Sequence, residues 1–382
     1  MGVLQGGVLS PILFNFYISL LPPPPPGIHL ISYADDCTSA ASGVNVEETP
    51  NRINNYLSQV AAFFHERKLL LNSQKSSATL FTTWTKEVND TLEVYIDDER
   101  VPTVKYPKIL VVTFDNLQTF AKQSANVCKS VSSRNRALKA LAGTSWGKDK
   151  ETIVSTYKTS CRSVINCCAP VWTPFLSDTQ WSKIQTRQNS ALRIATGCHS
   201  ITHPDHLHDE TSMLPVKAHN ELLTKQFLLS CHDPQHPNYE VANREMPSRS
   251  IRSDFRIFSG NIANYIPNPI YESTLSSAKN TMHRDSVRSV ITSSSVNRVL
   301  GSRPPQVDPS EKSLPRETRT VLAQLRSGFS NMLKNYRARI IPSEIDACPT
   351  AVADQQIYRL TISEINPWGR KKLLPGASPG GG

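Results

Sequence analysis

The chain has 382 residues, which is enough for two or three domains with a sizeable core. Its 42 Lys and Arg residues outnumber 32 Asp and Glu residues, and the formal charge of +10 favours polyanionic partners such as nucleic acid over acidic metabolites. The eight cysteines include no CxxC pair, which indicates a reduced, intracellular chain of the nucleus or cytoplasm. No segment resembles a signal peptide or approaches the roughly 18 apolar residues of a membrane span, so no membrane partner is expected.

The first elements along the chain are a predicted helix and a predicted β-hairpin. Ser10 followed by Pro11 is typical of a helix N-cap and first turn, and predicts a buried helix over the apolar run that ends at Leu21. The five prolines at 22–26 end this helix and indicate a stiff, extended connector. A short strand, Ile28–Ser32, and its hairpin partner, Cys37–Ala41, follow.

Beyond the hairpin the pattern changes from mixed to mostly helical. Apolar residues at three- and four-residue intervals predict a helix from Val46 to Phe64, and short strands follow at Ala78–Phe81, Leu92–Ile96 and Lys108–Phe114, with Asp97-Asp98-Glu99-Arg100 as a turn. Later helices are predicted near 118–142, 148–169 and 178–196, and again over Val321–Arg339. Gly143 and Gly147 indicate a break between the first two. Cys161 and Cys168 are predicted to be packing residues on the apolar side of the second. This order predicts an α+β fold.

Two adjacent carboxylates, Asp35 and Asp36, stand at the tip of the predicted hairpin. At a tip both side chains can project toward one metal ion, whereas in mid-strand they would face opposite ways. Mg²⁺ prefers hard oxygen ligands, and nucleotidyl transfer uses two such ions about 3.5–4 Å apart. An Asp-Asp pair by itself is usually a solvated turn, but the apolar strand, Tyr33 and the upstream motif that begins at Gln5 together favour a polymerase-type metal site.

The motif Gln5-Gly6-Gly7-Val8-Leu9-Ser10-Pro11, followed by Tyr33-Ala34-Asp35-Asp36, resembles the reverse transcriptases of non-LTR (LINE-type) retrotransposons, specifically the jockey-like group. The resemblance implies a partial right-hand polymerase palm, followed by a helical thumb and a mostly helical or irregular C-terminal region. It implies that Asp35 is the principal and Asp36 the secondary ligand of catalytic Mg²⁺. It also implies a nucleotide and template pocket formed by Gln5, Gly6, Ser10 and Tyr33.

Two further motifs carry implied roles. Leu71-Asn72-Ser73-Gln74-Lys75 resembles the next family motif, whose lysine is a candidate proton donor to pyrophosphate, while residue type alone favours an exposed loop cation at Lys75. The segment Tyr106–Asp115 resembles the primer-grip hairpin, with Lys108, Ile109, Leu110 and Val111 as its core. Glycine is expected where Val111 stands, and a β-branched residue there would crowd the turn.

The helices after the primer grip resemble the thumb and the region beyond it. Lys122, Lys129 and Arg136 recur every seven residues and fall along one side of a helix. Such a stripe suits the phosphates of a template-primer duplex, and an ordinary solvated helix face is the equally weighted alternative.

Five regions are expected. The resemblance gives a palm half with the primer-grip-like hairpin (1–116), a thumb and post-thumb region (117–231) and a C-terminal helical segment with a truncated Cys/His motif (319–350). The Ser-, Pro-, Asn- and Arg-rich composition predicts a loosely structured linker with short helices (232–318), and the tail (351–382) is divergent and expected to be disordered. The segment at Cys348 resembles the start of a zinc-knuckle-like motif, but no Cys or His follows it, so no zinc is expected there. Cys198, His199, His203, His206 and His208 have ligand-like spacing, although an ordinary connector is the favoured interpretation.

In the family, fingers and a first palm strand with a third carboxylate lie upstream of the position of Gln5, so the resemblance implies an N-terminally truncated enzyme. The leading interpretation is a fragment of an RNA-directed DNA polymerase, inactive alone, whose intact parent uses RNA template, DNA primer and deoxynucleotide. The alternative is a non-catalytic remnant that binds RNA, DNA or RNA–DNA hybrid, and a relic without a role is the third possibility. Whether this chain is itself an enzyme is left open.

Overall fold

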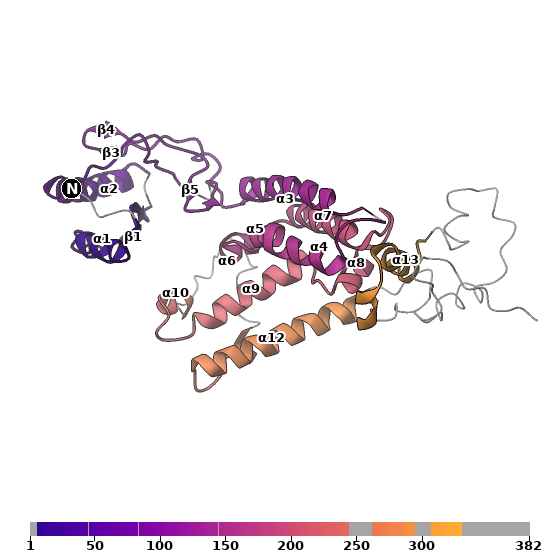
Figure 1. Cartoon of the computed structure of the whole chain (residues 1–382). Coiled ribbons are helices and arrows are strands. Elements are labelled where there is room, and N and C mark those ends of the chain that lie inside the picture. Colours follow the sequence, from indigo (N-terminus) through magenta and orange to yellow (C-terminus); the bar gives the residue numbers. More distant parts are fainter. Residues whose placement is uncertain are drawn as a thin grey trace, which may run out of the picture. The chain divides into compact units, whose positions relative to one another are not determined.

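The computed structural model describes residues 6–44, 46–82, 84–143, 145–243, 262–294 and 307–330. The chain forms two compact units, Met1–Lys122 and Gln123–Gly382, which we call unit 1 and unit 2. Unit 1 mixes helices with small antiparallel sheets, and the described part of unit 2 is helical, as Figure 1 shows for each by itself. The predicted α+β class is therefore correct at this level.

Unit 1 is built around helix α2, Glu48–Glu66. The predicted stripe forms its buried side: Tyr56, Val60 and Phe64 pack with Ile28 of the hairpin. A second apolar cluster, formed by Leu92, Val94, Ile96 and Val101, takes partly buried Ile53 and Leu57 from another side of the same helix. Apolar residues on two sides of one helix thus hold the hairpin and the later strands.

The predicted hairpin is present as strands β1, Ile28–Tyr33, and β2, Asp36–Ala41. The proline run before it is non-helical, as predicted, and α2 anchors it at both ends. The Tyr56 hydroxyl donates to the Pro22 carbonyl at 2.8 Å, and Arg52 donates to the Pro26 carbonyl at 2.9 Å. Proline carbonyls remain free to accept such bonds although the residue has no N–H to donate.

The helix before the prolines, α1, Ser10–Ile18, differs from the prediction. It was expected to be buried, but none of its residues is buried, because in unit 1 only its Ile18 end reaches the apolar cluster on α2. Ser10 is also not the N-cap: Leu9 holds that position without a side-chain cap bond. The Tyr17 hydroxyl, which donates to the Arg67 carbonyl at 2.6 Å, ties α1 to the end of α2.

The later strands of unit 1 are shorter than predicted. They form two hairpins, β3 (Tyr95–Ile96) with β4 (Glu99–Arg100) and β5 (Lys108–Ile109) with β6 (Val112–Thr113). The predicted strand Ala78–Phe81 has only an isolated bridge from Ala78 to Thr103. The alternation of apolar residues predicts an extended backbone, but it does not predict how many hydrogen bonds that backbone makes with a neighbouring strand. These segments therefore contain fewer paired residues than the prediction implied.

Unit 2 is a helical assembly that α3 (Ala121–Leu141) enters from unit 1. The following elements are α4 (Lys150–Tyr157), the π-helix η1 (Lys158–Arg162), α5 (Ser163–Asn166), α6 (Ala169–Trp172), the 3-10 turn η2 (Thr173–Phe175), α7 (Asp178–Thr196), α8 (Pro204–Thr211), α9 (Val216–Ser230) and α10 (Tyr239–Asn243). The predicted helices near 118–142 and 178–196 are confirmed, and Gly143 and Gly147 lie in the predicted break.

The predicted helix 148–169 is interrupted by one π turn and ends earlier. Cys161 is fully buried, as predicted, but Cys168 is exposed. Cys168 has φ 51, in the left-handed region, so the helical register that would have placed it on the apolar face is lost there.

The described segments after α10 contribute further helices to unit 2. Helix α12, Glu272–Ser293, buries Leu275 and Met282 in a cluster with Leu229 of α9, where the sequence predicted only short helices in a linker. A 3-10 turn η3 (Ala263–Tyr265) precedes α12, and η4 (Pro309–Ser313) leads into α13, Arg316–Arg326. The predicted helix Val321–Arg339 thus begins earlier, and its residues 331–339, like the expected tail, lie outside the described residues.

In the described part of the chain no helix has the length and apolarity that a membrane crossing requires.

Candidate active site

The two predicted metal ligands lie at the tip of the β1–β2 hairpin. Tyr33 pairs with Asp36, so Ala34 and Asp35 form a two-residue turn. Ala34 has φ 51 and Asp35 does not have a positive φ, which is the sign pattern of a type II′ turn that suits the twist of hairpin strands. Both carboxylates are exposed, as the prediction of a hairpin tip requires.

The hairpin has one covered and one open face. In the antiparallel register, Ile28, Leu30 and Cys37 share the face toward α2, while Ile31, Tyr33 and Asp36 share the other. On the open face Ile31 is 65% and Tyr33 67% exposed. The Asp36 side chain therefore lies on the open face with two apolar neighbours that nothing in the described part of unit 1 buries.

The covered face influences the chemistry of Cys37, the residue after the carboxylate pair. The residue as a whole is exposed, but the surrounding protein atoms partly desolvate its thiol. This burial, with smaller contributions from Asp36 and Asp35, raises the pKa of the Cys37 thiol. The thiol is thus held in its neutral form beside two negative charges.

The carboxylate pair fits a hard divalent cation in ligand type and accessibility, because two adjacent acidic side chains stand exposed at one turn. Within the described ranges, however, no group of three or more His, Cys, Asp or Glu side chains is placed to hold a metal ion. Asp35 and Asp36 are thus suited to be part of a metal site, and further oxygen ligands are needed to complete it.

The other residues predicted for the nucleotide pocket and the proton donor lie at different places in unit 1. Gly6 is exposed with φ 88, Ser10 opens α1, and Gln5 lies outside the described residues. Lys75 is exposed in a turn in which its backbone N–H donates to the Asn72 side chain at 2.9 Å. In the part of the chain that the structure describes, no hydrogen bond or ion pair joins Lys75 to Asp35 or Asp36, so its role as proton donor stays a prediction.

The predicted primer-grip residues form the β5–β6 hairpin. Lys108 and Ile109 are in β5, and Leu110 and Val111 are the exposed turn, 50% and 55% exposed. The residue with positive φ is Leu110, at 53°, and not Val111. The expectation that Val111 takes the position suited to glycine was therefore wrong by one residue, because the turn places its left-handed residue first.

Helix α3 carries the predicted cation stripe. Lys122, Lys129 and Arg136 are all exposed, opposite the buried Val127, Val131 and Leu138. The Lys122 ammonium also lies 5.7 Å from the Tyr106 ring centroid within unit 1. The stripe geometry follows the sequence, and its role toward nucleic acid stays a prediction.

Three members of the Cys/His cluster of unit 2, Cys198, His206 and His208, are buried, whereas His199 is partly buried and His203 is exposed. His208 is 7% exposed, its Nδ1 lies 2.8 Å from the Met213 carbonyl, and its Nε2 lies 3.0 Å from the Gln185 side chain. Burial lowers the pKa of His208 to about 4, and burial raises the pKa of the Cys198 thiol to about 11. These are the properties of packed, hydrogen-bonded groups, in line with the favoured interpretation.

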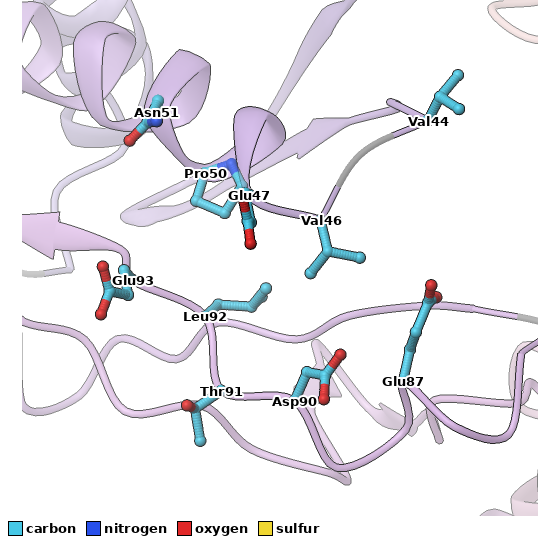
Figure 2. A pocket seen from close by; sticks show the side chains of 10 residues that line it. All are labelled: Val44, Val46, Glu47, Pro50, Asn51, Glu87, Asp90, Thr91, Leu92 and Glu93. Atoms are coloured by element: carbon cyan, nitrogen blue, oxygen red, sulfur yellow. The ribbon is translucent and has the colours of Figure 1, made fainter.

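A pocket of about 850 Å³ in unit 1 was not predicted from the sequence. It lies between the start of α2 and the segment before β3, and its lining includes four acidic residues: Glu47, Glu87, Asp90 and Glu93. Figure 2 shows Glu47 on one side and Asp90 and Glu87 on the other, pointing toward the same space. Four carboxylates with no basic residue in the lining disfavour phosphate groups, so this pocket is not a nucleotide site.

Sequence reasoning also missed the polar contacts that hold unit 2 together. Gln188 accepts from the Tyr157 hydroxyl at 3.0 Å and donates to the Leu214 carbonyl at 3.0 Å, and Gln185 accepts from the Val216 N–H at 2.8 Å. The available signal was that α7 carries polar residues at positions that helical spacing places among its apolar ones, and Gln188 is fully buried there beside Ile184 and Leu192. Buried amides imply partners, but the sequence does not say which.

The chain is similar to known proteins over much of its length. Residues 1–114 match the family model described as reverse transcriptase (RNA-dependent DNA polymerase). The chain is 24% identical over 265 residues to a probable RNA-directed DNA polymerase from transposon BS of Drosophila melanogaster, covering 66% of the chain and 28% of the relative. It is 25% identical over 227 residues to the corresponding protein from transposon X-element of the same organism, covering 56% of the chain and 24% of the relative.

The chain thus spans about a quarter of the length of these relatives. No solved structure matches it significantly. The family match covers the segment that contains the Asp35 and Asp36 hairpin, and the similarity to the transposon polymerases extends well beyond it. By its sequence the chain is similar to RNA-directed DNA polymerases of transposons, and residues 1–114 are the segment that matches the reverse transcriptase family.

Proposed function

We propose that the chain supplies the Asp35 and Asp36 carboxylates of an RNA-directed DNA polymerase of the jockey-like group. The single observation that carries the proposal is the hairpin tip, where two adjacent exposed carboxylates stand within the segment matched by the reverse transcriptase family. The expected substrates are an RNA template, a DNA primer and deoxynucleotides, and the expected cation is Mg²⁺.

In this proposal Asp35 and Asp36 bind the cation, and the turn at Ala34 fixes their direction. When bound, the cation would supply charge neutralisation for the primer hydroxyl and the phosphates. Tyr33 would contact the primer terminus from the open face. Gln5, Gly6 and Ser10 would contribute to the nucleotide and template pocket, which is distinct from the acidic pocket of Figure 2. The β5–β6 hairpin from Lys108 to Val111 would position the primer strand, and Lys75 would donate a proton to pyrophosphate.

The isolated chain is expected to be inactive or nearly so. Two carboxylates on one hairpin leave a two-metal site short of ligands, and the described residues offer no third group. The open face with Ile31 and Tyr33 fits the approach of another segment that carries a further carboxylate. Activity is therefore expected only when such a segment, in the same or another polypeptide, completes the palm.

The test is primer extension on an RNA template. The purified 382-residue protein is assayed alone and with a separately expressed polypeptide that contains the fingers and first palm strand of a related polymerase. Extension is expected only in the mixture, and Asp35→Asn should abolish it. Asp98→Asn is the matched control, because Asp97 and Asp98 form another acidic hairpin turn and lie outside the proposed site.

Robust extension by the chain alone would refute the split-site part of the proposal. Loss of extension in Asp98→Asn as large as in Asp35→Asn would refute the assignment of the metal ligands. No extension in any mixture, despite a folded complex, would refute the catalytic proposal.

That second candidate is binding of RNA or RNA–DNA duplex without catalysis. The observation that favours it is the exposed stripe of Lys122, Lys129 and Arg136 on α3. It predicts salt-sensitive binding that Asp35→Asn leaves unchanged.

A further inference from the structure

The cationic surface of unit 2 extends over two helices. We infer that the charged stripe of α3 continues onto α7, where Lys183 and Arg187 add a second row of side chains that bind the phosphate backbone of a nucleic acid. The inference deepens the nucleic-acid part of the proposed function and rests on it. We call the surface formed by Lys129, Arg136, Lys139, Lys183 and Arg187 the α3–α7 face.

Both helices are strongly unbalanced in charge. The sequence of α3 contains the cations Lys122, Lys129, Arg134, Arg136 and Lys139 and no carboxylate. The sole carboxylate of α7, Asp178, is in its first turn and pairs with Lys217 at 3.2 Å. A surface made of these helices therefore has a positive potential that their own acidic residues do not neutralise.

The contacts between the helices place the two rows side by side. The Asn135 side chain of α3 donates to the Arg187 carbonyl of α7 at 2.8 Å. Burial raises the pKa of the Cys128 thiol on α3, and the charges of Arg187 and Lys183 oppose this rise, so both cations lie in the neighbourhood of Cys128. Cys128 directly precedes Lys129 on α3, so the α7 cations lie at the same level of the helix as this part of the stripe.

Helical geometry puts the α3 cations on the side that continues toward α7. At about 100° per residue, Lys129, Arg136 and Lys139 fall within an arc of ~80° that begins next to Cys128. Arg134 instead lies on the opposite flank, where it donates to the Ser160 carbonyl. The three outward cations of α3 and the two of α7 thus belong to one continuous face.

The five side chains of the α3–α7 face are available to a ligand. All five residues are exposed. Among the described residues, none of the ion pairs within 4.0 Å involves any of them. Exposed cations without carboxylate partners keep their full charge for an external anion.

The arrangement fits a linear polyanion better than a small anion. Lys129 and Arg136 are about 10 Å apart along the helix axis, and packed helices lie about 8–10 Å apart, so the charges are spread over a wide area. Successive phosphates of a nucleic acid can contact such rows without base-specific groups. Binding is therefore expected to be independent of sequence and strongly dependent on salt.

The test measures binding of the full 382-residue protein to labelled RNA–DNA duplex and single-stranded RNA across a salt series. Plotted as log K against log salt concentration, binding to the duplex falls with a negative slope, and Lys183→Gln/Arg187→Gln should make this slope shallower by about 2. The same variant should weaken binding about tenfold or more at low salt. Lys183→Gln alone should make the slope shallower by about 1. This single variant keeps Arg187, and therefore keeps its interaction with Cys128. The matched control is Arg284→Gln/Arg288→Gln, which removes two exposed cations from α12 and should change neither quantity.

The outcomes separate this inference from the proposed function. If Lys129→Gln/Arg136→Gln weakens binding while the folded Lys183 and Arg187 variants bind like the wild type, the inference is wrong and the proposed function stands. If the wild type binds no nucleic acid, the nucleic-acid part of the proposed function is wrong as well. Equal affinity for polyglutamate of the same length would show a general polyanion surface and overturn the assignment to nucleic acid.

Discussion

Glu210 joins three segments of unit 2 through a buried charge network. Its carboxylate accepts from Lys150 Nζ at 2.7 Å and from Arg326 Nε and Nη2, both at 2.8 Å. Arg326 also donates to Glu311 at 2.5 and 3.0 Å. The Glu210, Lys150 and Arg326 side chains are only 6%, 10% and 11% exposed. Burial alone would lower the pKa of Arg326, and its bonds to Glu210 and Glu311 outweigh this and raise it.

We expect Glu210→Gln to destabilise unit 2 strongly. The change leaves Lys150 buried without a carboxylate partner among the described residues, whereas Arg326 keeps Glu311. Breaking a buried pair in this way costs about 3–5 kcal/mol. In a domain of roughly 150–250 residues, 1 kcal/mol corresponds to about 2–4 °C, so the unfolding midpoint should fall by about 6–20 °C.

The assay is thermal and urea unfolding followed by circular dichroism. Glu317→Gln is the matched control, because Glu317 is exposed in the first turn of α13, and its effect should stay within about 0.5 kcal/mol. Adding Lys150→Met to Glu210→Gln should recover part of the loss, since it removes the unpaired charge. A loss below about 1 kcal/mol for Glu210→Gln would refute the reasoning that the network is buried and paired.

Three further predictions concern a turn, a histidine and a tether. Leu110→Gly should stabilise unit 1 by about 0.5–1 kcal/mol, because glycine adopts φ 53 without strain. Val111→Gly should destabilise unit 1 instead, and equal effects of the two variants in urea unfolding would contradict the turn assignment. Because burial lowers the pKa of His208 from 6.5 to about 4, the unfolded chain binds the proton first and stability is lost as pH falls through this window. His208→Gln should reduce that loss, by up to about 3 kcal/mol between pH 7 and pH 4, and an unchanged pH profile would argue against a buried neutral imidazole. Tyr17→Phe removes the 2.6 Å bond to the Arg67 carbonyl, so amide exchange in α1 should increase while α2 keeps its protection.

The features that the sequence predicted well depend on local signals. The hairpin tip that carries Asp35 and Asp36 follows from one short strand, one turn and the return strand, all within a few residues. Helix α7 begins at a Ser177 capping box and ends at Gly197, which has φ 71, so both ends are encoded next to the helix itself. Short-range rules suffice for such elements because the deciding contacts lie within one or two turns.

The features that the sequence missed depend on partners far along the chain. Glu210 and Arg326 are separated by 116 positions, and nothing in either local sequence names the other. The Arg316 guanidinium likewise donates to the Ile194 and Ala195 carbonyls, and so caps the end of α7 from a distant segment. It also donates to the carbonyls of Gly143 and Lys148, in the break after α3. Helix α12 was missed because its apolar positions are sparse and become meaningful only against α9.

The open face of the β1–β2 hairpin links completion of the metal site to stability. The face toward α2 is closed, so a segment that brings a further carboxylate to Asp36 has to approach over Ile31 and Tyr33. Covering these side chains, which are about two-thirds exposed, should contribute roughly 1–2 kcal/mol each. We therefore expect the complementing polypeptide to slow amide exchange in β1 and raise the unfolding midpoint of unit 1. Asp35→Asn should preserve this stabilisation while abolishing extension, because it removes a metal ligand and leaves the apolar face intact. Loss of both together would show that the carboxylates, and not the open face, hold the completing segment.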